Sequence, residues 1–320
     1  MDITAAITQM GILILIVILG FFLSKVNYID KPMSDKLTKL LINVTLPCMI
    51  IAAVGNMDFD AAVMRIPWAV VLSIVFFACI LVASVIITFI LFVPKADRAC
   101  YIFMGITTNT GFMGMPIIAS VCGDQTVIVS SIFVTVVAVF IYSVGFGILS
   151  VDQQKKKALA SDSIEGYRIT IPWKSIVNPA MIASVVAIIM LLAQVRLPGV
   201  LEGAMSMVGS MTAPISMMVV GFFLSTITFK ELFAEWRMFP MALLRFLVVP
   251  VAAFFLMRLF VEDPTLLSVF VLMMAMPVGS MVPAFVGQFE GNAVLASKGT
   301  IVTTTLSFAF IPLLLTVMML

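Results

Sequence analysis

Residues 109–116 read Asn-Thr-Gly-Phe-Met-Gly-Met-Pro, and residues 277–283 read Pro-Val-Gly-Ser-Met-Val-Pro. Each stretch interrupts an apolar run that is otherwise suited to a membrane-spanning helix. Proline removes a backbone donor and clashes with the preceding turn, and glycine weakens a helix interior. Freed backbone groups cannot face lipid, so they must meet protein, water or a ligand. The two stretches therefore predict two broken helices with a polar site at their interruptions.

The composition around these stretches is that of an all-α integral membrane protein. Of 320 residues, 62% are apolar and 11% charged, whereas soluble domains are nearer half apolar and a quarter charged. A spanning helix needs about 20 apolar residues. Ten transmembrane helices are predicted, at 3–23, 35–55, 66–93, 98–121, 124–150, 175–195, 202–228, 237–260, 264–287 and 292–319. The first is too long for a signal peptide, so we expect it to be retained.

The loop charges predict an orientation for these spans. With the N-terminus outside, thirteen lysines and arginines fall in inner loops and three in outer loops. Positive residues favour the cytoplasmic side, so we expect both termini outside. Arg245 and Lys298 fall inside predicted helices. For Arg245, a functional role in the membrane and snorkelling toward the cytoplasmic face both remain open.

Weak internal similarity predicts two inverted halves. The cytoplasmic linker 151–174 separates a first five-helix repeat, 1–150, from a second, 175–320. Because five is odd, the second half must enter the membrane from the opposite side. Gly111 and Gly279 lie 168 positions apart, and Pro116 and Pro283 lie 167 apart, as do Pro47 and Pro214. Inverted repeats with matching helix interruptions are typical of secondary transporters and mark their binding sites.

The chemistry expected at the interruptions favours an anion. A broken helix exposes N–H groups and the positive end of its dipole, and Asn109 and Ser280 can bond a carboxylate without burying a charge. Simple packing kinks are the other interpretation. The predicted substrate-binding residues are Asn109, Thr110, Gly111, Pro116, Pro277, Gly279, Ser280 and Pro283. The predicted supporting residues are Asn43, Pro47, Pro214 and Lys298.

Several function classes are disfavoured by composition. The chain has no histidine, and its four cysteines match no metal or redox spacing, so no metal, cofactor or enzymatic activity is expected. A net charge of +2 suggests no nucleic-acid partner. No Asp or Glu sits centrally in a predicted span, which predicts transport without a buried protonatable carboxylate.

The segment from Asn109 to Asp124 and the Pro277–Pro283 motif resemble the auxin efflux carrier family, which includes bacterial transporters and the plant auxin exporters. The resemblance covers almost the whole chain. It implies helices four and nine that cross at Pro116 and Pro283, an elevator-like transport domain, a scaffold domain and often a homodimer. It also implies a bacterial cytoplasmic membrane location, with lipid and a small organic anion such as malate, malonate or an auxin-like acid as partners. The short central linker departs from the long plant carriers.

Two alternatives within transport remain open at this stage. A sodium-coupled organic anion symporter of the bile-acid-transporter type would hold sodium on unwound carbonyls. A channel is the other, although nothing in the sequence resembles a filter loop or a charged ring.

Overall fold

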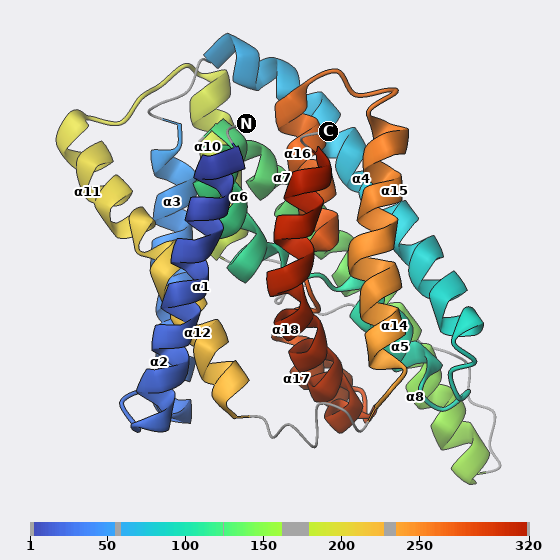
Figure 1. Cartoon of the computed structure of the whole chain (residues 1–320). Coiled ribbons are helices and arrows are strands. Elements are labelled where there is room, and N and C mark those ends of the chain that lie inside the picture. The colour runs from blue at the N-terminus through green and yellow to red at the C-terminus, as the bar shows by residue number, and fades with distance from the viewer. Residues whose placement is uncertain (1–2, 55–58, 124, 162–178, 227–234, 319–320) are drawn as a thin grey trace.

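Helices make up all the regular structure in the described part of the chain (Figure 1). The computed structural model describes residues 3–54, 59–123, 125–161, 179–226 and 235–318. In hydrocarbon only a helix or a closed barrel satisfies every backbone group, and these apolar sequences take the first solution. The one strand-like feature among the described residues is an isolated antiparallel bridge between Thr108 and Val278.

The helices of the first half follow the predicted spans, often in two or three pieces. They are α1 (Ile3–Lys25), α2 (Lys31–Leu40), η1 (Leu41–Thr45), α3 (Leu46–Ala52), α4 (Phe59–Ile90), α5 (Arg98–Ile106), η2 (Thr110–Gly114), α6 (Met115–Cys122), α7 (Gln125–Phe140), η3 (Ile141–Gly145) and α8 (Phe146–Ser161), where η marks a π-helical turn.

The second half is divided in a similar way. Its described elements are α10 (Pro179–Leu192), α11 (Gly199–Ser210), α12 (Thr212–Ser225), α14 (Met238–Leu243), η4 (Leu244–Val248), α15 (Val249–Met257), α16 (Pro264–Ala275), α17 (Val282–Gln288) and α18 (Ala293–Met318).

Five described helical runs are long and apolar enough to cross a membrane by themselves. They are Val63–Ile90, Gln125–Lys156, Gly199–Ser225, Met238–Met257 and Ala293–Met318. Shorter apolar helices cover Gly11–Lys25, Ile182–Leu192 and Pro264–Ala275. The protein is thus a multi-pass helical membrane protein. The count of ten spans and the inverted relation of the halves remain predictions.

The predicted linker 151–174 begins as helix, because α8 continues to Ser161. Lys156 and Asp152 form an ion pair of 2.7 Å one turn apart, and such pairs stabilise an exposed helix. Residues 162–174 of the predicted linker lie outside the described part of the chain.

Three of the four described π-helical turns end two residues before a proline. The turns η1, η2 and η4 precede Pro47, Pro116 and Pro250 respectively. Proline has no N–H to give and its ring crowds the carbonyl four residues earlier, so the preceding turn widens. These prolines therefore loosen the helix without ending it.

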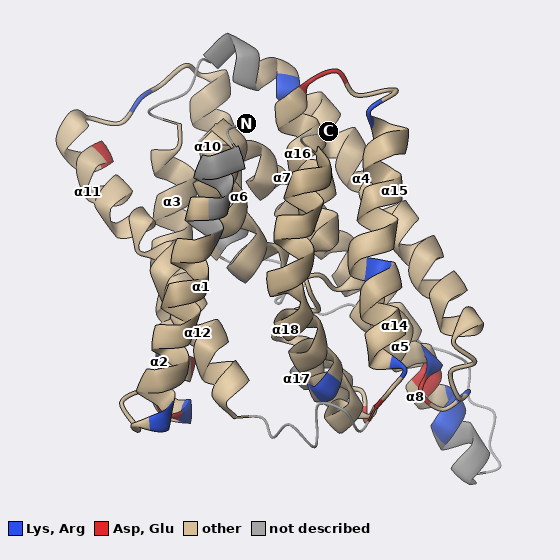
Figure 2. Cartoon of the chain, viewed as in Figure 1, with Lys and Arg blue, Asp and Glu red and all other residues tan. Residues whose placement is uncertain are grey.

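Charged side chains gather toward the two ends of the helix bundle, which leaves a mostly uncharged middle (Figure 2). The helix α1 begins, and α18 finishes, toward the same end (Figure 1). An uncharged belt between two charged ends is the arrangement that a bilayer requires.

Candidate functional site

The two predicted interruptions are real breaks in the helices. The helix α5 ends at Ile106, and residues 107–109 are not helical before η2 begins. The helix α16 ends at Ala275, Met276 is extended (φ −63°, ψ 139°), and α17 starts only at Val282. Each break frees backbone groups in the interior of an apolar bundle.

The two breaks satisfy each other through their backbones. The amide N–H of Asn109 donates to the carbonyl of Pro277 at 2.7 Å, and the N–H of Gly279 donates to the carbonyl of Thr107 at 2.8 Å. This reciprocal pair forms the antiparallel bridge between Thr108 and Val278. A third helix takes part, because Val278 N–H donates to Thr303 Oγ1 of α18 at 3.1 Å. Segments some 170 residues apart are therefore joined by short hydrogen bonds.

Two buried side-chain hydroxyls at this junction form no hydrogen bond within the part of the chain that the structure describes. Thr107 and Thr108 are buried, and their Oγ1 atoms have no hydrogen-bond partner among the described residues. Beside them, a Cβ built on Gly111 would meet no atom within 4 Å, whereas one on Gly114 would meet Met273 and Met276. The wide turn η2 thus packs on α16 on one side and faces open space on the other. Buried hydroxyls without a partner are uncommon in folded proteins, so two at adjacent positions distinguish this junction from most other helix contacts.

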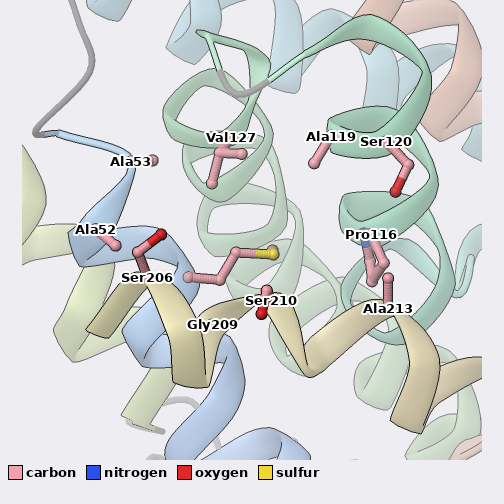
Figure 3. Close-up of a pocket in the computed structure, with 11 residues that line it drawn as sticks. Ala52, Ala53, Pro116, Ala119, Ser120, Val127, Ser206, Gly209, Ser210 and Ala213 are labelled. Carbon is pink, nitrogen blue, oxygen red and sulfur yellow. The ribbon is translucent and has the colours of Figure 1, made fainter. Parts of the chain in front are cut away.

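A cavity of about 270 Å³ lies beside α6, with Pro116 on its wall (Figure 3). The lining comes from α3, α6 and α7 of the first half and from α11 and α12 of the second. Small side chains keep it open, and hydroxyls supply its polarity. Its lining residues are Met49, Ala52, Ala53, Pro116, Ala119, Ser120, Val127, Ser206, Gly209, Ser210 and Ala213.

Among the predicted substrate-binding residues, the backbone bonds bring together Asn109, Pro277 and Gly279. Thr110 and Gly111 begin the adjacent wide turn. Ser280 lies in the turn before α17, and Pro283 in the first turn of α17. The joining bonds involve neither Pro116 nor Pro283, which lie in the helices that follow the breaks.

The predicted supporting residues are more scattered. Pro47 and Pro214 lie in the first turns of α3 and α12, next to helical stretches that line the cavity. Asn43 is exposed on η1, and Lys298 is partly buried near the start of α18.

Sequence reasoning did not single out the cavity serines Ser206 and Ser210. They are four residues apart on α11, so they share one helix face, and Gly209 lies between them. The run of small and polar residues from 199 to 213 carried the available signal, since it makes this span one of the two least hydrophobic. Within the described residues, no three His, Cys, Asp or Glu side chains form a group that could hold a metal ion.

A family model described as "Membrane transport protein" matches residues 5–315. The chain belongs to the auxin efflux carrier family. The resemblance drawn from the fourth- and ninth-helix segments is confirmed, and the protein is a multi-pass transporter from a family of transporters rather than enzymes. No curated protein matches the chain.

Proposed function

We propose that this auxin efflux carrier family member moves a small organic anion across the cytoplasmic membrane by alternating access, with the solute held beside the joined breaks of helices four and nine. Two five-helix inverted halves together form a scaffold domain and an elevator-like transport domain. Malate, malonate and auxin-like acids are the candidate substrates. The two paired backbone bonds between residues 107–109 and 277–279 are the observation that carries the proposal.

Those bonds matter because they fix two breaks at one point. Segments that were only kinked for packing would not need to pair with each other across 170 residues. The helix ends α5 and α16 lie 169 positions apart in the chain, close to the offset of 167 to 168 found in the sequence. Equivalent breaks in two halves support an inverted repeat with a site at its centre.

The anion preference rests on what the site contains. The N-terminal side of η2 and α6 points toward the break, and the start of a helix favours negative charge. At the junction itself the unpaired hydroxyls of Thr107 and Thr108 are neutral donors, although neither residue lines the cavity. No carboxylate lines the cavity in the described structure, so an anionic solute meets no like charge there.

The cavity supports a small solute and a direction of access. Its volume of about 270 Å³ is just below the usual range for ligand pockets, about 300 to 1,000 Å³, so only a small solute would fit. Its lining includes the last turns of α3 and α6 and the first turn of α7. In the proposed orientation these ends face outward, so this conformation would receive solute from the outside.

Counterflow in proteoliposomes tests the proposal. Purified protein is first screened by thermal shift against mono- and dicarboxylates, since a ligand at 100 times its Kd stabilises by about 2.7 kcal/mol. The best carboxylate is then used as radiolabelled probe. We expect saturable counterflow that Asn109→Ala reduces at least about tenfold, because the interaction lost is worth about 1.5 kcal/mol or more.

Thr305→Ala is the matched control, since Thr305 is exposed on α18 and its hydroxyl bonds only to its own helix. Equal counterflow in Asn109→Ala and wild type would remove Asn109 from the site. Absence of carboxylate binding or counterflow in the wild type would reject the anion proposal. Flux without counterflow would indicate a channel. The family match does not favour the bile-acid-transporter type of fold.

A further inference from the structure

The most deeply buried charge in the described structure is Arg245, whose accessible surface is 0%. It lies on the wide turn η4, within the apolar run Met238–Met257. Its side chain therefore does not snorkel to the membrane surface. A buried guanidinium stays charged and is costly unless its donors are paired, so its surroundings need an explanation.

Arg245 contacts the ends of both interrupted helices. Its Nε donates to the carbonyl of Gly105 at 2.7 Å, and its Nη1 donates to the carbonyl of Met274 at 3.1 Å. Gly105 is the next-to-last residue of α5, and Met274 is the next-to-last residue of α16. One side chain from a third helix thus binds the same position of two equivalent helix ends.

The positive charge of Arg245 is about equal to the summed partial negative charge of the two helix ends that it contacts. The last four carbonyls of a helix lack partners, and they carry roughly half a negative charge in total. Two such ends converge on Arg245, so roughly one negative charge meets one guanidinium. Among the described residues, no carboxylate forms an ion pair with Arg245, and the ring centroid of Phe246 lies 5.0 Å from its Cζ. The amino group Nη2 has no partner in the described structure.

Resting on the proposed function, we propose that Arg245 is a built-in cation that positions the two broken helices and keeps their junction attractive to an anion. Without it, the two carbonyl ends would repel a carboxylate or recruit a cation from solution. The guanidinium fills that place permanently. The transporter then needs no inorganic cation at the junction.

Chemical rescue tests the positioning role without any substrate. Arg245→Ala opens a guanidinium-sized space bounded by the two carbonyls. We expect the variant to melt at a lower temperature than wild type, and millimolar guanidinium to restore much of the loss while the neutral analogue urea does not. Rescue by both compounds, or by neither, would overturn the proposal. Wild-type melting should not differ between sodium and choline salts, and a sodium-specific stabilisation would also overturn it.

A second pair of variants isolates the charge and covers the case in which Arg245→Ala does not fold. Arg245→Met keeps the bulk, and Arg245→Lys keeps the charge. For counterflow of a monovalent auxin-like acid we expect the KM of Arg245→Met to rise about tenfold or more, as for loss of a unit charge about 10 Å from a monovalent solute at an effective dielectric constant near 20. Arg245→Lys should stay nearer the wild-type value. Equal KM values for Met and wild type would refute the electrostatic role.

Arg258→Met is the matched control, because Arg258 is exposed just beyond α15 and stacks on Phe254. Its KM should equal that of wild type. A wild-type protein that transports no carboxylate would refute the proposed function, while the guanidinium rescue would still decide the role of Arg245 in holding the helices.

Discussion

Two of the joints between the halves of this protein are built in opposite ways. At the first, α1 and α12 run as unbroken helices whose backbones nearly touch, because Gly20 faces Met218 and Gly221 faces Val17 and Phe21. At the second, α5 and α16 end inside the bundle, and the buried backbone segments that follow them hydrogen-bond to each other. The first joint leaves no room for a side chain at Gly20 or Gly221, whereas the second has unpaired hydroxyls at Thr107 and Thr108 and open space at Gly111.

The difference suggests a division of labour. Small residues let membrane helices pack closely without polar groups, which gives a rigid contact. At the charged end of this joint, Lys25 Nζ donates to the carbonyl of Ser225 at 3.0 Å, and Ser24 and Ser225 share a hydrogen bond. In the proposed function, the junction of the broken helices is the part that binds the solute and rearranges. Substitutions that attack one joint should therefore affect stability and transport in different proportions.

The largest effect is expected at the closely packed joint. A Cβ at Gly221 would overlap the carbonyl oxygen of Val17, so Gly221→Leu must push α1 and α12 apart. Overpacking usually costs about 1–3 kcal/mol and sometimes more, and here the obstacle is backbone that cannot rotate away. We expect a large fall in melting temperature or loss of the monodisperse peak in size-exclusion chromatography.

Gly203→Leu is the matched control on α11, where a Cβ would meet no atom within 4 Å. It should melt close to wild type. If the two variants behaved alike, the close contact between α1 and α12 would not be a determinant of stability.

A smaller effect is expected at the junction of the breaks. Asn109 has φ −77°, which proline can adopt, so Asn109→Pro removes the N–H that donates to Pro277 without forcing the backbone angle. A buried carbonyl left unpaired costs about 1–3 kcal/mol. Asn109→Ala keeps the N–H, so thermal melting should rank wild type and Ala together above Pro. Equal melting of the Pro and Ala variants would mean that the bridge contributes nothing to stability.

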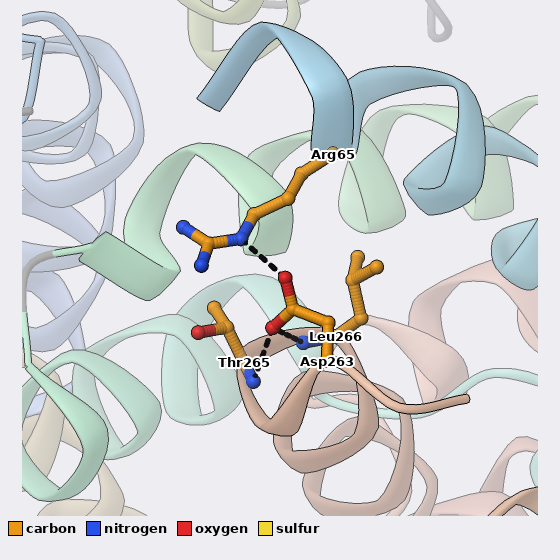
Figure 4. A network of polar contacts seen from close by, with 4 residues as sticks. All are labelled: Arg65, Asp263, Thr265 and Leu266. Atoms are coloured by element: carbon orange, nitrogen blue, oxygen red, sulfur yellow. Dashed lines mark hydrogen bonds and ion pairs between the residues drawn. The ribbon is translucent and has the colours of Figure 1, made fainter. Parts of the chain in front are cut away.

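The smallest effect belongs to a third joint between the halves, at the end of the bundle where α4 begins and α16 starts (Figure 4). Arg65 Nε lies 2.6 Å from Asp263 Oδ2, and the other carboxylate oxygen accepts from the N–H groups of Thr265 and Leu266. Burial alone would raise the pKa of the Asp263 carboxyl, but the bonds from Arg65 and the two amides outweigh it and lower the pKa below its ordinary value.

The sign of the pH dependence follows from that lowered pKa. The ion pair stabilises the folded state fully above the unfolded pKa of about 3.9, and this contribution disappears as the pH falls through the lower folded pKa. Asp263→Asn keeps the helix-capping oxygen and removes the charge. At pH 6 its free energy of unfolding should be lower than that of wild type by less than about 1 kcal/mol, so it should melt at a slightly lower temperature. The difference between the two proteins should disappear toward pH 3. A gap that widened with acid would contradict this assignment.

The two helix breaks could be predicted from the sequence alone, because glycine and proline change the backbone locally. The motifs at 109–116 and 277–283 identified both breaks, since a missing N–H is a property of the residue itself. The first break, however, lies at 107–109, before the motif's proline. Its position depends on pairing with residues 170 positions away, which no local pattern encodes.

The partners of Arg245 and the cavity could not be predicted from the sequence, for similar reasons. The partners of Arg245 are main-chain carbonyls, and a carbonyl has the same chemistry at every residue, so only the fold identifies Gly105 and Met274. The cavity is formed by small side chains from five helices, and small residues are common at all helix contacts in membranes.

The wide turns before Pro47, Pro116 and Pro250 have a consequence for how such chains change length. A π-helical turn holds about one residue more than an α-helical turn over the same rise. Deleting one residue from such a turn would restore ordinary winding and leave both flanking helix faces where they are, whereas a deletion elsewhere would rotate every later side chain by about 100°. At these turns one residue can therefore be lost during evolution, and the helix still presents the same face to the rest of the protein.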